Sequence, residues 1–195
     1  MTTIKNAVLV YTESTPNPGT LKFVANKMIL PNRSADFQDA DSAQQSPLAE
    51  ALFEFPFVKG VFIASNFITI TKDEKSVWHE IIPDLRDFIK GYLSSDEPIV
   101  SEEYLKQQAD TQSERAAAGD VEAQIHDMLE KYVRPAIEMD GGAITFKSYE
   151  DGVVTLTLQG ACSGCPSSTL TLKSGIEGML KRLIPDVKEV VAEEA

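Results

Sequence analysis

Short stretches in which apolar and polar residues alternate, or in which apolar residues run together, open the chain and predict β-strands. The expected strands are residues 7–11, 21–25, 58–63 and 67–71. Ser65-Asn66 separates the last two strands and predicts the turn that pairs them. Residues 32–45 are mostly polar, and we expect an exposed loop there.

Two helices are predicted between and after these strands. Ser46 followed by Pro47 is typical of a helix start, because serine caps the first turn and proline suits the first helical position. We expect this short helix to run through Phe53. A longer amphipathic helix is predicted by apolar residues that recur on one face, namely Trp78, Ile81, Ile82, Leu85, Phe88, Ile89 and Tyr92. Pro83 lies inside it, so we expect a kink or a lost hydrogen bond on the exposed face.

The stretch from Ser94 to Asp120 differs in kind from what precedes it. Its first residues break the helix, and residues 107–115 carry no apolar stripe that could pack against a core. We interpret the stretch as an acidic, polar linker. The sequence therefore predicts a first domain at 1–93, a linker at 94–119 and a second domain at 120–195.

The second domain is predicted to contain a helix, two strands, a second helix and a last strand. Val121, Ile125, Met128, Leu129, Tyr132 and Val133 form the apolar stripe of its first helix. Asp151-Gly152 lies between two strand-like runs and is a strong hairpin signal. The second helix ends at Leu183, and residues 187–192 form the last strand. The expected fold class is α+β, with an antiparallel sheet plus helices in the first domain and the order α-β-β-α-β in the second.

Composition and charge exclude several classes of function. With 43% hydrophobic and 25% charged residues, the chain resembles ordinary soluble globular proteins. No apolar run approaches the roughly 18–20 residues of a membrane span, so no membrane partner is expected. The formal net charge of −12 argues against a nucleic-acid partner, because phosphate binding needs a basic surface. The first residues contain neither a signal-peptide core nor an Arg-rich transit peptide, which predicts a cytoplasmic protein of bacterial type.

The two cysteines of the chain stand three positions apart, in Gly160-Ala161-Cys162-Ser163-Gly164-Cys165-Pro166. A strand-like run precedes them and a helix-like run follows, so both thiols lie at a helix N-terminus, where the dipole favours thiolate. A disulfide closing so small a loop would remove little unfolded-state entropy, which favours metal or redox chemistry. A closed zinc or iron–sulfur site usually takes four protein ligands, and one pair supplies two. Either the site is a dithiol, or a second copy of the chain completes it.

Other interpretations of Cys162 and Cys165 are inert buried thiols, half of a zinc site, and a thiol–disulfide oxidoreductase like thioredoxin. A thioredoxin-like motif is expected after the first strand of a β-α-β unit, whereas this one follows a predicted hairpin. Nearby, Gly175-Ile176-Glu177-Gly178 matches the GXXG of KH nucleic-acid modules. We interpret these glycines instead as allowing close packing on a helix face, because a glutamate and an acidic domain oppose phosphate binding.

Motifs in both halves of the chain match a known family. In the second half they are Gly160–Ser168, Arg134-Pro135 and Met139-Asp140-Gly141-Gly142. In the first half they are Thr15-Pro16-Asn17-Pro18, Leu21-Lys22-Phe23 and Val61–Thr69. Through these motifs the second domain resembles the C-terminal domain of NifU-like (Nfu) iron–sulfur cluster proteins. The first domain resembles the N-terminal domain that many of them carry.

This resemblance implies a carrier rather than an enzyme. Nfu-type proteins hold a [4Fe-4S] cluster between two subunits, with a [2Fe-2S] form as an alternative, and each subunit provides the two thiolates of its C-x-x-C. Here those ligands would be Cys162 and Cys165. The implied partners are a second copy of the chain, apo iron–sulfur proteins that receive the cluster, and an upstream assembly scaffold that supplies it. The alternative function is a thiol–disulfide oxidoreductase that uses the same two cysteines.

Overall fold

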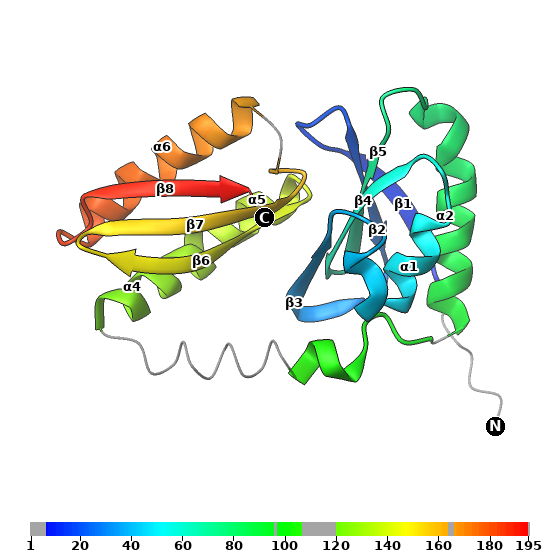
Figure 1. Ribbon diagram of the computed structural model, residues 1–195, viewed down its shortest axis with the longest axis horizontal. Helices are drawn as coiled ribbons and strands as arrows, with labels where there is room; N and C mark the ends of the chain where they lie inside the picture. The colour runs from blue at the N-terminus through cyan, green and yellow to red at the C-terminus, as the bar shows by residue number, and fades with distance from the viewer. Residues whose placement is uncertain (1–6, 96, 107–119, 164–165, 195) are drawn as a thin grey trace. The chain divides into compact units, whose positions relative to one another are not determined.

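The computed structural model describes residues 7–95, 97–106, 120–163 and 166–194 (Figure 1). The chain divides into two compact units. The first unit contains the residues up to Ser14 and Gly19–Ser101, and the second contains Thr15–Pro18 and Glu102–Ala195. None of the helices in the described ranges is both long enough and apolar enough to span a bilayer.

The first unit is built on a five-stranded sheet whose neighbouring strands are all antiparallel. In spatial order the strands are β1 (Val10–Ser14), β2 (Thr20–Ala25), β5 (Phe67–Lys72), β4 (Val58–Ser65) and β3 (Leu30–Phe37). The unit also contains the α-helices α1 (Pro47–Phe53) and α2 (Trp78–Ser95). Apolar side chains of β2, β4 and β5 and of both helices are fully buried in its core, among them Phe23, Ile63, Ile68, Leu52, Leu85 and Ile89. The antiparallel sheet with helices confirms the predicted fold class of this half.

Local sequence signals explain several of these boundaries. The Ser46 side chain accepts a hydrogen bond from the Ala49 N–H at 3.1 Å, and Pro47 opens α1, as its start signal predicted. Ser65 has a positive φ of 44° at the turn between β4 and β5, which pair as predicted. Helix α2 continues through Pro83, which lies on the exposed side.

The prediction of an exposed loop at residues 32–45 is wrong. Residues 30–37 form β3, and Ser42–Gln45 form a short 3-10 helix. Strand β3 lies at the edge of the sheet, and its register shifts between Leu30 and Ser34, where Asn32 adopts a φ of 56°. Only Ala35 and Phe37 alternate into the core after this irregularity, so the strand carries little of the apolar pattern by which strands are recognised.

The second unit has the predicted order of helix, two strands, helix and strand. Its first helical segment comprises α4 (Asp120–Met128), one π-helical turn η2 (Leu129–Val133) and α5 (Arg134–Met139). Strands β6 (Gly142–Glu150) and β7 (Val153–Gly160) follow, then α6 (Pro166–Leu183) and β8 (Glu189–Glu194). The first helical segment and α6 cover the same face of the sheet (Figure 1), and apolar residues of all these elements form one core.

The hairpin signal is confirmed, because Asp151 and Gly152 both have positive φ, 52° and 92°, between β6 and β7. The last strand begins at Glu189 rather than at residue 187. Residues before it form a turn, in which the Val187 N–H donates to the Ile184 carbonyl and the Lys188 N–H donates to the Gly152 carbonyl.

Strand β8 pairs with β7 in parallel, so β7, α6 and β8 form a β-α-β unit. The cysteine segment lies between β7 and α6, directly after the first strand of that unit. The predicted position after a hairpin is confirmed, since β6 and β7 form one. That β7 also opens a β-α-β unit was not predicted. The reason is that the direction of the last strand depends on how α6 crosses the sheet, which the local pattern does not encode.

Candidate functional site

The cysteine segment begins where β7 ends. Gly160 has a φ of 64°, a left-handed conformation that glycine adopts without strain, and it turns the chain away from the sheet. The Ser163 N–H donates to the Gly160 carbonyl at 3.1 Å and closes the turn. Cys162 lies in this turn. Cys165, the other predicted ligand, lies outside the described residues, immediately before α6 begins at Pro166.

Two consecutive glycines at the start of β6 support this turn. The Ala161 N–H donates to the Gly141 carbonyl at 3.2 Å, and Gly142 pairs with Gly160 across the sheet. A Cβ atom placed on Gly142 would lie 2.6 Å from the Cys162 sulfur and 2.8 Å from the Gln159 carbonyl oxygen. Cys162 can therefore occupy its observed position only because residue 142 has no side chain. In the sequence these glycines are part of the family motif Met139-Asp140-Gly141-Gly142. The signal for their steric role is a glycine pair at the point where a strand begins.

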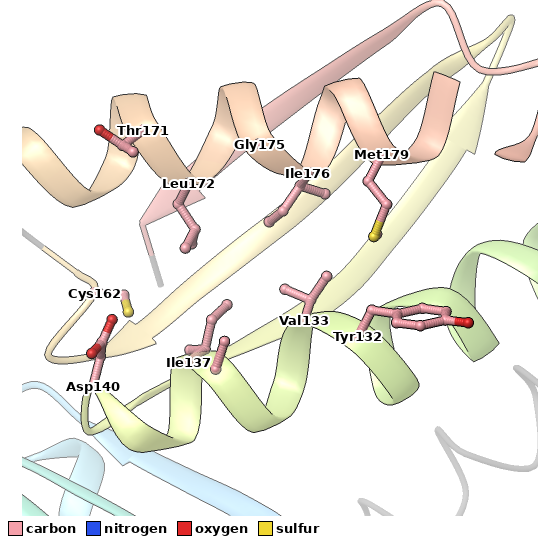
Figure 2. A pocket seen from close by; sticks show the side chains of 11 residues that line it. Tyr132, Val133, Ile137, Asp140, Cys162, Thr171, Leu172, Gly175, Ile176 and Met179 are labelled. Carbon is pink, nitrogen blue, oxygen red and sulfur yellow. The ribbon is translucent and has the colours of Figure 1, made fainter. Parts of the chain in front are cut away.

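Cys162 is 3% exposed and belongs to the buried core of the second unit. Its sulfur reaches one end of a groove of about 540 Å³ between the α5 side and α6 (Figure 2). Asp140 lies beside it at the same end of the groove. The walls are otherwise mostly apolar, with Tyr132, Val133, Ala136 and Ile137 on one side and Thr171, Leu172, Gly175, Ile176 and Met179 on the other. The thiol is thus held in apolar surroundings at the mouth of an open groove.

The π-helical turn shapes one wall of this groove. Pro135 has no N–H to donate to the preceding turn, and an irregular turn accommodates that missing bond. Across this turn Val133 is 7% exposed and faces the core, whereas Tyr132 is 51% exposed and lines the groove. The π turn thereby places a large aromatic ring at the surface, next to an otherwise apolar wall.

Helix α6, the opposite wall, is fastened to the last strand by Glu177. The Glu177 carboxylate accepts hydrogen bonds from Lys181 at 2.6 Å and from the Val190 N–H at 3.1 Å. The bond from Lys181, followed by that from Val190, holds the pKa of Glu177 below its usual value. Because the folded-state pKa is lowered, this contribution to stability is present above the unfolded-state pKa of the carboxyl and is lost as the pH falls through the folded-state pKa.

No group of three or more His, Cys, Asp or Glu side chains gathers closely enough to hold a metal ion among the residues that the structure describes. Cys162 is the described candidate ligand, and its sequence partner Cys165 lies beyond the described ranges.

Two family models match the chain, one in each half. The model "Scaffold protein Nfu/NifU N terminal" matches residues 10–96, and the model "NifU-like domain" matches residues 125–191. The chain belongs to the Nfu/NifU family. The resemblance inferred from the cysteine, glycine and N-terminal motifs is thereby confirmed.

Two named relatives are similar across nearly the whole chain, and one solved structure is similar to about half of it. A human protein named "NFU1 iron-sulfur cluster scaffold homolog, mitochondrial" is 40% identical over 94% of this chain and 71% of its own length. The Arabidopsis thaliana "NifU-like protein 5, mitochondrial" is 40% identical over 97% of this chain and 69% of its own. The solution structure of a NifU-like protein from Saccharomyces cerevisiae is 29% identical, with a TM-score of 0.44, over 49% of this chain and 87% of that one.

The names of these relatives contradict the predicted cytoplasmic location of bacterial type, because several are named mitochondrial. That prediction was wrong because it rested on the absence of a leader in the first residues. The sequence covers 71% of the human relative, so the residue at which it begins carries no information about targeting.

Proposed function

We propose that this chain is a scaffold and carrier that holds an iron–sulfur cluster on Cys162 and Cys165 and passes it to apo-proteins. The observation that carries the proposal is the position of Cys162. It lies in a turn fixed by Gly141 and Gly142, with its sulfur at the end of an open apolar groove. Membership of the Nfu/NifU family, whose relatives are named iron–sulfur cluster scaffolds, supports the same function.

The cargo is a [4Fe-4S] cluster shared between two copies of the chain, with a [2Fe-2S] cluster as the alternative. Soft thiolates suit iron–sulfur clusters, and such a cluster takes four of them. One chain contains two cysteines, so two chains supply the full set. The apolar surroundings of Cys162 limit the access of water to its sulfur, which favours retention of the cluster until a receiver arrives. The partners of the carrier are then its second copy, an upstream scaffold and the apo-proteins that it serves.

A second candidate function is thiol–disulfide exchange by the same two cysteines. It is favoured by one observation, the β-α-β unit formed by β7, α6 and β8, since a thioredoxin-like dithiol follows the first strand of such a unit. Both functions need thiolates, so the state of the thiols does not distinguish them. They differ in whether the protein binds iron and sulfide and in whether its mass is that of a dimer or a monomer.

Anaerobic reconstitution with iron and sulfide, followed by sizing with in-line light scattering, tests the proposal. We expect a brown dimer that returns to a colourless monomer when the cluster is chelated, because binding that exists only in the dimer shifts the equilibrium toward it. Residues 101–195 carry 9 Lys and Arg against 17 Asp and Glu, so moderate salt should favour the loaded dimer by screening repulsion.

Two results of this experiment would contradict the carrier. A colourless monomer that forms a redox-active disulfide would favour the oxidoreductase. A monomer with close to four irons per chain would mean that the ligand set is wrong, because one chain has only two cysteines.

We also propose that the functional division of the chain is a first domain at 1–93, a linker at 94–119 and a cluster domain at 120–195. The first linker residues are fastened to the first unit, since the Ile99 carbonyl accepts from Ser46 at 2.6 Å and the Ser101 N–H donates to Gln45 at 2.7 Å. Limited trypsin should therefore cut first after Lys106 or Arg115, leaving two folded fragments. Mass spectrometry of the early products checks this, and first cleavage after Lys59 or Lys72 would contradict the division.

A further inference from the structure

One charged side chain stands at the end of the groove where Cys162 lies. Asp140 is the single charged residue among the described residues that line this hollow of about 540 Å³. Figure 2 shows its carboxylate pointing toward the Cys162 sulfur. Asp140 is exposed, and within the described ranges no hydrogen bond or ion pair occupies its carboxylate. A full negative charge therefore stands next to a candidate ligand.

Backbone hydrogen bonds hold Asp140 beside Cys162. Asp140 follows the last residue of α5, and its N–H donates to the Ala136 carbonyl at 3.4 Å. The next residue, Gly141, accepts a hydrogen bond from the Ala161 N–H at 3.2 Å. Residue 140 precedes one member of this bonded pair and Cys162 follows the other. The two side chains are thus brought together by the backbone, and a change of the carboxylate alone leaves those bonds in place.

The sequence around the Cys162 end of the groove supplies no positive side chain to offset this carboxylate. Residues 135–146 and 160–172 form that end, and they contain two acidic residues, Glu138 and Asp140, and neither Lys nor Arg. Arg134, which precedes the first range, binds Glu130 at 2.6 Å and lines a different hollow. Lys173, which follows the second range, is not among the residues that line the groove. The local charge beside Cys162 is therefore negative.

Helix α6 acts on a negative ligand in the opposite sense. It begins at Pro166, directly after Cys165, and its unpaired N–H groups and dipole favour negative charge there. A [4Fe-4S] cluster bound by four thiolates carries net negative charge. The start of α6 therefore attracts the cluster, whereas Asp140 repels it. When two copies share a cluster, each copy contributes one Asp140, so two carboxylates act on the same cargo.

We propose that Asp140 limits how tightly the chain holds its cargo, because its carboxylate repels the anionic cluster and thereby speeds release to a receiver. The proposal rests on the proposed carrier function. In release, each bond from an iron to a thiolate of the carrier is replaced by a bond to a ligand of the receiver. The carrier's thiolates regain the protons that the receiver's thiols lose, and no electron is transferred. Asp140 forms no bond to iron and acts by its charge alone.

The first test measures the charge that Asp140 places at Cys162, in the full chain without a cluster. In a Cys165→Ser background Cys162 is the only thiol, and its reaction rates with dithionitrobenzoate, a dianion, and with dithiodipyridine, which is uncharged, are compared. Both reagents react with the thiolate, so the ratio of the two rates does not depend on how much of the thiol is ionised. At low salt Asp140→Asn should raise the ratio of the dianion rate to the uncharged rate about threefold or more. At about 1 M salt, where the Debye length is about 3 Å, this difference should shrink.

Two control variants separate charge from structure. Asp140→Glu keeps the charge and should give the ratio of the parent. Asp127→Asn removes one negative charge from an exposed position of α4, roughly 20 Å from Asp140 along the same helical segment at 1.5 Å per residue, and should leave the ratio unchanged. An unchanged ratio in Asp140→Asn, or an equal rise in Asp127→Asn, would overturn the proposal. So would a failure of Cys162 to react with the uncharged reagent, because the proposal needs its sulfur to reach the open groove.

The second test measures release. The protein with both cysteines is loaded anaerobically, and bipyridine, an uncharged chelator, removes its iron. At low salt Asp140→Asn should lose its cluster about tenfold more slowly than the wild type, and should transfer it correspondingly more slowly to an apo-ferredoxin that takes a [4Fe-4S] cluster. Asp140→Glu and Asp127→Asn should release it at the wild-type rate. Less cluster loaded on Asp140→Asn, or faster loss from it, would contradict the proposal, because the carboxylate would then bind iron or stabilise the turn.

The two tests distinguish a failure of this proposal from a failure of the carrier function. If the wild type loads and transfers a cluster but Asp140→Asn releases it at the same rate, the carrier stands and the role of Asp140 is refuted. If neither the wild type nor any variant loads a cluster, the carrier function fails, and the role of Asp140 in release fails with it even where the two reagents detect its charge.

Discussion

Serine in place of Cys162 or of Cys165 is expected to reduce the iron and sulfide bound after reconstitution about tenfold or more, since hard oxygen poorly replaces a soft thiolate. Each substitution removes two of four ligands from a cluster shared by two copies, because both copies carry it. The fold of the second unit should survive, since serine is close to cysteine in size. Iron and sulfide analysis, with circular dichroism as the test of folding, measures both effects.

Ser163→Ala is a suitable control for the cysteine variants, because Ser163 lies in the same turn and the change keeps a small side chain. It should load as much iron and sulfide as the unaltered protein. Full loading of either cysteine variant would refute the ligand assignment, whatever the control does.

Gly142→Ala is expected to impair cluster binding without touching a ligand. The added Cβ would lie 2.6 Å from the Cys162 sulfur, so the sulfur or the β6 backbone has to move. The φ of Gly142 is not in the left-handed region, so the backbone itself tolerates alanine and the effect is one of space. We expect about tenfold less cluster, as for other residues that position a ligand, and a loss of about 1–3 kcal/mol in the free energy of unfolding from overpacking.

Gly91→Ala provides the comparison for this variant, because its added Cβ meets nothing within 4 Å and alanine favours a helix. It should bind cluster normally and unfold at an equal or higher denaturant concentration. If Gly142→Ala were as stable and as fully loaded as Gly91→Ala, the Cys162 position would not depend on the absence of a side chain at 142.

The elements that the sequence predicted well are those whose signals are local. Ser46-Pro47 marked the start of α1, and Asp151-Gly152 marked the β6–β7 turn, because capping and positive φ depend on the residues at those positions. Strand β3 was missed since only Ala35 and Phe37 face the core after its irregular start. The parallel pairing of β8 with β7 was missed because it depends on the path of α6 across the sheet.

The candidate site was predictable only in part, for the same reason. The cysteine pair stands out in the sequence because the chain has no other cysteine. The steric role of Gly142 and the groove that ends at Cys162 appear only when residues far apart in the sequence come together. Tyr132 had been assigned to a buried stripe by its spacing, but the π turn at η2 leaves it 51% exposed. A regular helical period cannot predict a turn that departs from it.

The parallel pairing of β7 and β8 also determines when the sheet that carries the Cys162 turn can be completed during synthesis. The sheet of the second unit is incomplete until residues 189–194 have been made, although the cysteine pair at 162 and 165 is made well before them. At about 5–20 residues per second, roughly 2–7 s separate the end of β7 from the end of β8. Throughout this interval β7 lacks its parallel neighbour, so the turn that holds Cys162 extends from a sheet that is still incomplete.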